Sequence, residues 1–187
     1  MFHLANPAVT AQAAQRCEPS PLAAEVTALF DRFRAPLLRY LSSFGLDPAD
    51  TEEIVQEVFL SLFQHLARGK SRRNLPGWIF RVAHNLALRQ RGRRRQAFDR
   101  AGPHMPLVAV DPAPNPEDGY ALRQAHQHVL AVVAALPELD RRCIYLRAEG
   151  FRYREIARIL DISLGAVALS LAQSLARLAR CAGRYHP

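Results

Sequence analysis

The side chains with the clearest potential for chemistry are the cations between Lys70 and Arg100. This segment has a net charge of +9, whereas the whole chain carries +8, because residues 1–69 and 101–118 are each net negative by 3. A charge separated in this way favours one surface for a polyanion such as nucleic acid and another for a protein partner. The basic residues of the segment are Lys70, Arg72, Arg73, Arg81, Arg89, Arg91, Arg93, Arg94, Arg95 and Arg100.

Side chains that would perform catalysis or hold a metal do not cluster in the sequence. The three cysteines, Cys17, Cys143 and Cys181, lie far apart and form no C-x-x-C pair. The seven histidines have no spacing typical of zinc ligands. We also find no glycine-rich phosphate loop and no nucleophile–base motif. The sequence therefore predicts a binding protein and not an enzyme, with no metal and no other cofactor.

The elements that position the cations are all expected to be helices. Apolar residues recur every three or four positions between Leu22 and Phe44 and again between Thr51 and Leu66. Pro36 should kink or break the first of these helices. After a polar loop at 68–74, Pro76 opens a third helix that runs into the arginine block.

The rest of the chain indicates a second helical module. Residues 101–118 contain five prolines and no periodicity, which is typical of an extended linker. Helical patterning resumes after Tyr120, and no segment alternates as a strand would. We predict an all-α fold of two small helical domains joined by a Pro-rich linker. The predicted organisation is a flexible tail at 1–20, a first domain at 21–98, the linker at 99–118 and a second domain at 119–187.

The N-terminus lacks the pattern of a secretory signal, and no apolar run approaches the roughly 18 residues that span a bilayer. We therefore expect no membrane span and a cytoplasmic location.

The second domain ends in a helix-turn-helix pattern. A short helix at 153–160 precedes a turn at 161–163, in which Ser163 is the expected N-cap of the next helix. Such a unit normally lays its second helix in the major groove of DNA. A plain helical hairpin in a bundle core is the alternative. The side chains expected to point inward are Val167, Leu171, Leu175 and Leu178.

Four motifs, in register along the chain, resemble extracytoplasmic-function (ECF) sigma factors of the sigma-70 superfamily. Residues 53–59 (EIVQEVF) resemble the polymerase-binding helix of region 2, and residues 78–87 (WIFRVAHNLA) resemble its promoter-melting helix. Residues 137–151 and 153–165 resemble region 4. The resemblance implies a transcription initiation factor that binds core RNA polymerase and directs promoter recognition and melting.

The resemblance also implies partners and roles for particular residues. One acidic helix face would grip the clamp helices of the largest polymerase subunit, and region 4 would meet the flap of the second subunit. The polymerase-binding residues would be Asp50, Glu53, Gln56 and Glu57. The residues for the −10 element and single-stranded DNA would be Lys70, Arg72, Arg73, Asn74, Trp78, Arg81, Asn85, Arg89, Arg91, Arg93, Arg94 and Arg95. Those for the −35 element would be Arg152, Arg154, Ser163, Ser170, Gln173, Arg177 and Arg180. Trp78 has a second interpretation, as an ordinary core residue.

The expected recognition helix departs from the family pattern. Between Ser163 and Ala176 there is no charged side chain, although Arg, Lys, Asn and Gln are the usual readers of base edges. Region 4 would then contact DNA mainly through its flanking arginines, or present an apolar surface to another protein. Two alternatives stay open: a sigma-like adaptor whose region 4 binds a protein in place of a −35 element, and a helix-turn-helix regulator that is not a sigma factor. The sequence also leaves open an anti-sigma factor or another recruiting protein.

Overall fold

The computed structural model describes residues 20–101, 127 and 129–182. The helices are α1 (Pro21–Ser42), α2 (Pro48–Ala67), α3 (Leu75–Ala101), α5 (Glu138–Ala148), α6 (Tyr153–Leu160) and α7 (Leu164–Ala182). A further helical stretch spans 129–134, and the described residues form no strand, so the prediction of an all-α fold is confirmed. The predicted tail up to residue 19, and the predicted linker from residue 102 onward, lie outside the described residues.

The first module begins each of its first two helices with a side-chain cap and a proline. Ser20 accepts a hydrogen bond of 3.2 Å from the amide of Ala23, and Asp47 accepts one of 2.8 Å from the amide of Asp50. These bonds satisfy amides that have no partner within a helix, and a proline in the first turn has no amide to satisfy.

Of the two effects expected of Pro36, a kink or a break, the break does not occur. α1 runs through Pro36 without interruption to Ser42. Phe33 and Leu37, on either side of the proline, are both buried and hold the helix against its neighbours. Proline removes one helical hydrogen bond, and burial of two large apolar side chains offsets a loss of that size.

The core of the first module lies between α1, α2 and α3. Leu37, Tyr40 and Leu41 of α1 are fully buried, as are Val58 of α2 and Phe80 of α3. Tyr40 and Phe80 meet edge to face with ring centroids 5.6 Å apart. These contacts fix the exposed faces of α2 and α3, on which the predicted binding residues lie.

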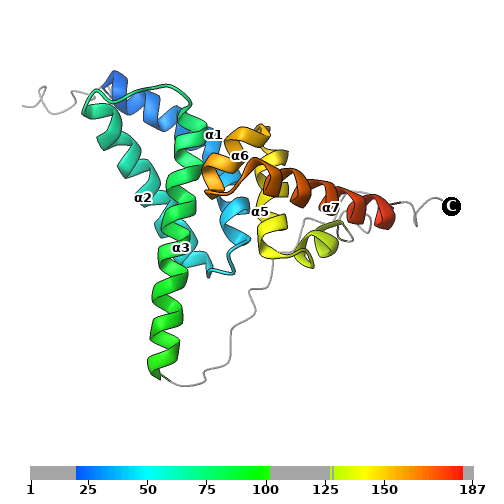
Figure 1. Cartoon of the computed structure of the whole chain (residues 1–187). Helices are drawn as coiled ribbons and strands as arrows, with labels where there is room; N and C mark the ends of the chain where they lie inside the picture. Colours follow the sequence, from blue (N-terminus) through cyan, green and yellow to red (C-terminus); the bar gives the residue numbers. More distant parts are fainter. Residues whose placement is uncertain (1–19, 102–126, 128, 183–187) are drawn as a thin grey trace, which may run out of the picture.

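The second module packs α5, α6 and α7 together and rests against α3 and α1 (Figure 1). Phe151, in the connection between α5 and α6, meets Phe80 edge to face at 5.0 Å. The two modules thus share one apolar core. α3 continues past residue 98 to Ala101, and its C-terminal part projects beyond the rest of the fold (Figure 1).

No single helix in the described ranges is long and apolar enough to cross a membrane. α6 and α7 reach that length and composition only as a pair, and they are bent by 109° relative to each other.

Candidate nucleic-acid interface

The loop before α3 presents its cations to solvent. Lys70, Arg72 and Arg73 are all exposed. Arg72 reaches back to Glu25 of α1, with Nε 3.3 Å from each carboxylate oxygen, so one of the loop cations is already paired. The pair is exposed and contributes little to stability, which leaves Arg72 available to a phosphate.

Asn74 has a structural task in addition to its predicted one. Its φ of 54° lies in the left-handed region, which asparagine tolerates better than most residues. Its Oδ1 accepts a hydrogen bond of 3.3 Å from the amide of Gly77 at the start of α3. A Cβ at Gly77 would lie 2.6 Å from the side-chain nitrogen of Asn74, so a larger residue there would displace the Asn74 side chain. Asn74 therefore fixes the junction between the loop and α3.

Trp78 lies at the edge of the core. The side chain is partly buried against the core and lies beside His65, with ring centroids 4.8 Å apart. Arg81, Asn85 and Arg89 follow at helical spacing on an exposed face of α3. That face joins the cationic loop to the arginine block.

The charge pattern of the sequence predicts separate surfaces for DNA and for a protein partner. In the structure, however, the arginine block lies against the acidic face of α2. Arg94 forms ion pairs with Asp47 and with Asp50, the latter at 2.6 Å. Arg89 and Arg93 line a small pocket of about 50 Å³ together with Glu53 and other residues of α2. The predicted polymerase-binding residues and the predicted DNA-binding residues therefore adjoin.

α2 presents a stripe of side chains that the sequence analysis identified only in part. Glu53, Gln56 and Glu57 are exposed, as predicted, while Asp50 is partly covered by Arg94. Leu60 follows on the same face and is 59% exposed, and Phe63 is 39% exposed. Leu60 lies one helical turn beyond Gln56 and Glu57, so helical spacing alone places it on the same exposed face and could have identified it.

The helix-turn-helix forms as the sequence predicts. Asp161 ends α6 with a φ of 55°, in the left-handed region. Ser163 caps α7 by accepting a hydrogen bond of 3.1 Å from the amide of Ala166, which confirms it as the N-cap. Arg152, Arg154 and Arg158 line a groove of about 650 Å³ with the first turns of α7. Arg158 was not among the residues predicted to bind the −35 element, although it lies one helical turn beyond Arg154 and lines the same groove.

The buried face of α7 differs from the predicted one. Val167 and Leu171 are fully buried as expected, but Leu175 is 52% exposed, so the prediction that it points inward is wrong. Ser170 and Ser174 complete the buried face instead. Small side chains at these positions let α7 approach α5 closely.

Ser170 is therefore not a groove residue, contrary to the prediction. Its hydroxyl donates a hydrogen bond of 2.7 Å to Oδ1 of Asp140 in α5. Both side chains are buried, and the bond satisfies two polar groups that would otherwise be costly to bury.

The outward face of α7 is largely apolar. Leu164 is 45% exposed and Leu169 is 60% exposed, and the polar side chain between Ser163 and Ala176 that still faces outward is Gln173. Arg177 and Arg180 are exposed one and two turns farther on. A groove-facing helix of this composition offers one amide for base-edge contacts, and its cations lie at the flanks.

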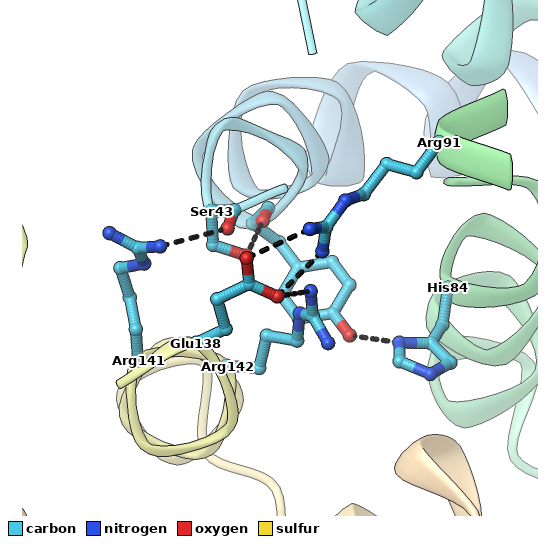
Figure 2. Close-up of polar contacts among 7 residues, drawn as sticks. Ser43, His84, Arg91, Glu138, Arg141 and Arg142 are labelled. Carbon is cyan, nitrogen blue, oxygen red and sulfur yellow. Dashed lines mark hydrogen bonds and ion pairs between the residues drawn. The ribbon is translucent and has the colours of Figure 1, made fainter. Parts of the chain in front are cut away.

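Glu138, the first residue of α5, joins the two modules through a network that Figure 2 shows. Its carboxylate takes a two-point contact from Arg91 of α3, at 2.6 and 2.8 Å, and a third hydrogen bond of 2.9 Å from Arg142. The hydrogen bonding from Arg91, reinforced by the positive charges of Arg91, Arg142 and Arg141, holds the pKa of Glu138 below its ordinary value. The carboxylate is therefore ionised at neutral pH.

A histidine lies beneath this network. A hydrogen bond of 2.8 Å joins Nδ1 of His84 to the hydroxyl of Tyr40, and both side chains are buried (Figure 2). Burial, reinforced by the positive charge of Arg142, lowers the pKa of His84 to about 4. His84 is thus neutral in the folded protein at neutral pH, and it is a structural residue of the core.

Comparison with protein families gives two matches. The family model described as sigma-70 region 2 matches residues 29–97, and the one described as sigma-70 region 4 matches residues 126–178. Together they account for both helical modules and lie in the order expected from the motifs.

Several characterised proteins are similar to this chain. The ECF RNA polymerase sigma factor SigK of Mycolicibacterium vanbaalenii is 26% identical over 83% of this chain and 81% of its own length. The ECF RNA polymerase sigma-E factor of Escherichia coli is 31% identical over 63% of this chain and 66% of its own. The probable RNA polymerase sigma factor RfaY of Xanthomonas campestris is also 31% identical, but this chain spans only about a third (33%) of its length.

Among solved structures, the sigma factor RpoE of Bartonella quintana, in complex with the anti-sigma factor NepR, has a TM-score of 0.58. It is 22% identical and covers 86% of this chain and 99% of the solved one. CnrH, in complex with the cytosolic domain of CnrY, has a TM-score of 0.54 at 21% identity. At these identities the likeness is one of fold.

Proposed function

The chain belongs to the ECF sigma factors of the sigma-70 family, and on that premise we propose that it binds core RNA polymerase through α2 and captures promoter DNA with the loop at 68–74 and α3. The observation that carries the proposal is the exposed stripe of α2 lying directly beside the cationic face of α3. Initiation requires both contacts in one place, because the strand must separate where polymerase holds the factor. The proposed organisation is a region 2 domain at 21–98, a linker at 99–118 and a region 4 domain at 119–187.

Docking to polymerase would use both halves of the α2 stripe. Glu53, Gln56 and Glu57 provide negative charge and hydrogen-bonding groups at one end, and Leu60 with Phe63 provides apolar area at the other. Interfaces commonly combine an apolar centre with a polar rim. The proposed partner is the pair of clamp helices in the largest subunit.

Strand capture would use the exposed cations along the loop and α3. Single-stranded DNA is bound by cations that follow its phosphates and by aromatic rings on which bases stack. Lys70, Arg73 and Arg81 supply exposed charge, and the uncovered part of Trp78 supplies a ring between them.

Region 4 would hold DNA mainly by its phosphates. The arginines of the α6 groove, Arg152, Arg154 and Arg158, can neutralise backbone charge without reading sequence. Of the predicted readers, Gln173 alone stays outward within the uncharged stretch of α7. We infer weak discrimination at the −35 element, together with contact to the flap of the second polymerase subunit.

The proposal is tested by changing charge on α2 and measuring co-elution with purified core polymerase. The double change Gln56→Arg and Glu57→Arg should abolish co-elution without loss of helical content, because it reverses the charge of the docking face. The matched control is Thr27→Arg with Asp31→Arg, which makes the same change in charge at exposed positions of α1. Unchanged co-elution of the α2 variant would refute docking through this face.

A second candidate function is that of an adaptor, favoured by the exposed leucines of α7. An outward face with Leu164, Leu169 and Leu175, flanked by the arginines of α6, fits an amphipathic helix with acidic edges better than it fits base pairs. The solved neighbours include sigma factors bound to anti-sigma proteins, and we propose a partner of that kind in the cytoplasm for this face. Footprinting at −35 distinguishes the two functions, because an adaptor would leave that element unprotected.

A further inference from the structure

Glu138 pairs with an arginine that the sequence predicts to contact DNA. It accepts two hydrogen bonds from Arg91, a member of the arginine block, and one from Arg142 (Figure 2). A carboxylate that receives a two-point contact from one guanidinium and a further bond from another offers the same geometry as two oxygens of a phosphate. Its position in the first turn of α5 also favours negative charge, because the amides at a helix N-terminus are partly positive.

The contact is accessible to a competing anion. The side chain of Arg91 is 36% exposed and that of Glu138 is 49% exposed, so an incoming phosphate can approach without first unfolding either module. Exposed ion pairs of this kind contribute little to stability and exchange partners readily. The pair joins α3 to α5 across 47 residues of sequence, so breaking it also loosens the contact between modules.

We propose that Glu138 acts as an internal substitute for phosphate, which occupies Arg91 while the two modules are closed and is displaced when DNA binds. The Glu138–Arg91 pair therefore lowers the affinity of the closed chain for DNA. The inference rests on the proposed function, since it takes Arg91 to be a DNA contact.

The remaining contacts between the modules provide a control. Arg39 of α1 pairs with Glu149 at 2.8 Å, and Nη2 of Arg141 donates a hydrogen bond of 3.3 Å to the carbonyl of Ser43. Arg39 lies outside the cationic segment, so the Arg39–Glu149 pair closes the modules without occupying a DNA-binding arginine. Breaking it should loosen closure and leave Arg91 engaged.

The test is a thermodynamic cycle on the full chain, with affinity for a short fluorescein-labelled oligothymidylate measured by anisotropy. Glu138→Gln should raise affinity about three- to fivefold, the factor that corresponds to one exposed ion pair. It should also steepen the slope of log K against log salt by about 0.7, the value for one added phosphate contact on a single strand. Glu149→Gln, the matched control, should leave that slope unchanged.

A second comparison begins with two variants that keep Glu138. Arg95 lies one helical turn beyond Arg91, is exposed, and has no ion pair among the described residues. Arg95→Ala should flatten the slope of log K against log salt by about 0.7. Arg91→Ala should change that slope little while Glu138 is present, because Arg91 then only exchanges one anion for another. In the Glu138→Gln background, Arg91→Ala should have the full effect.

The proposal is overturned if the effects of Arg91→Ala and Glu138→Gln simply add, or if Glu138→Gln leaves affinity unchanged. Failure of this cycle is distinguishable from failure of the proposed function. Co-elution with core polymerase through α2 does not involve Glu138, and it would persist if only the phosphate substitute were wrong.

Discussion

Both modules bury apolar side chains, but α7 of the second module differs from α2 and α3 of the first in what it leaves exposed. In α2 and α3 the apolar stripes are buried and most charged side chains lie outside, so the binding face is the polar face. In α7 two serines are buried while Leu164, Leu169 and Leu175 face outward. The first module is typical of a protein that meets charged partners. In the second module, α7 packs through two serines beside Val167 and Leu171, and this leaves its other leucines outward, where they are available to an interface.

The largest expected effect concerns the buried serine face. Ser170→Arg should destabilise the protein by at least about 3 kcal/mol, because a large cation would be forced between α5 and α7. Ala168→Lys, at an exposed position of the same helix, should change stability by no more than about 0.5 kcal/mol. Urea unfolding followed by circular dichroism measures both. Equal stability of the two variants would mean that α7 packs through another face.

The next prediction is that the stability of the protein depends on pH through His84 of the first module. His84 has a folded pKa of about 4 against an ordinary value of 6.5, so the unfolded chain binds more protons between these values. The contribution of His84 is therefore complete above pH 6.5 and is lost as the pH falls toward 4, by up to about 3 kcal/mol.

His84→Gln should flatten this dependence in urea melts recorded across that range. His65, which is less buried and lies beside Trp78, provides the control as His65→Gln. A dependence that is the same in the His84 variant and the parent would exclude His84 as its source.

A third prediction compares the two modules through the two promoter elements that they are proposed to contact. Scrambling the −10 element should reduce run-off transcription at least about a hundredfold, because the loop at 68–74 and α3 present many contacts. Scrambling −35 should reduce it less than about tenfold, or about 1.4 kcal/mol, since α7 offers Gln173 as its outward polar reader. A hundredfold loss at −35 would show that other side chains of region 4 read the bases.

The smallest effect sharpens the comparison within α7 itself. Leu169→Ala should alter the free energy of unfolding by no more than about 0.5 kcal/mol, because the side chain is 60% exposed. Leu171→Ala, two positions farther along and fully buried, should cost about 2–5 kcal/mol. If Leu169→Ala nevertheless weakens binding to a protein partner in a pull-down, the outward leucines form an interface.

Much of the fold could be predicted because its determinants are local. Helix periodicity, the N-cap at Ser163 and the turn at Asp161 each involve residues within about four positions of one another, and each is observed. The acidic residues of α2 and the cations of the loop were identified for the same reason. Leu60 was missed because it breaks the rule that apolar residues face inward.

The sequence by itself determined the helices, the two modules and the character of the α2 face and of the cationic loop. The tertiary structure alone decided that Ser170 and Ser174, and not Leu175, complete the buried face of α7, because that depends on how closely α5 approaches Ser170. It also decided that Arg91 meets Glu138 and that Arg94 meets Asp47, since ion pairs between helices depend on their relative orientation. No periodicity in a sequence encodes a contact across 47 residues, which depends on packing between the modules such as that of Phe80 against Phe151.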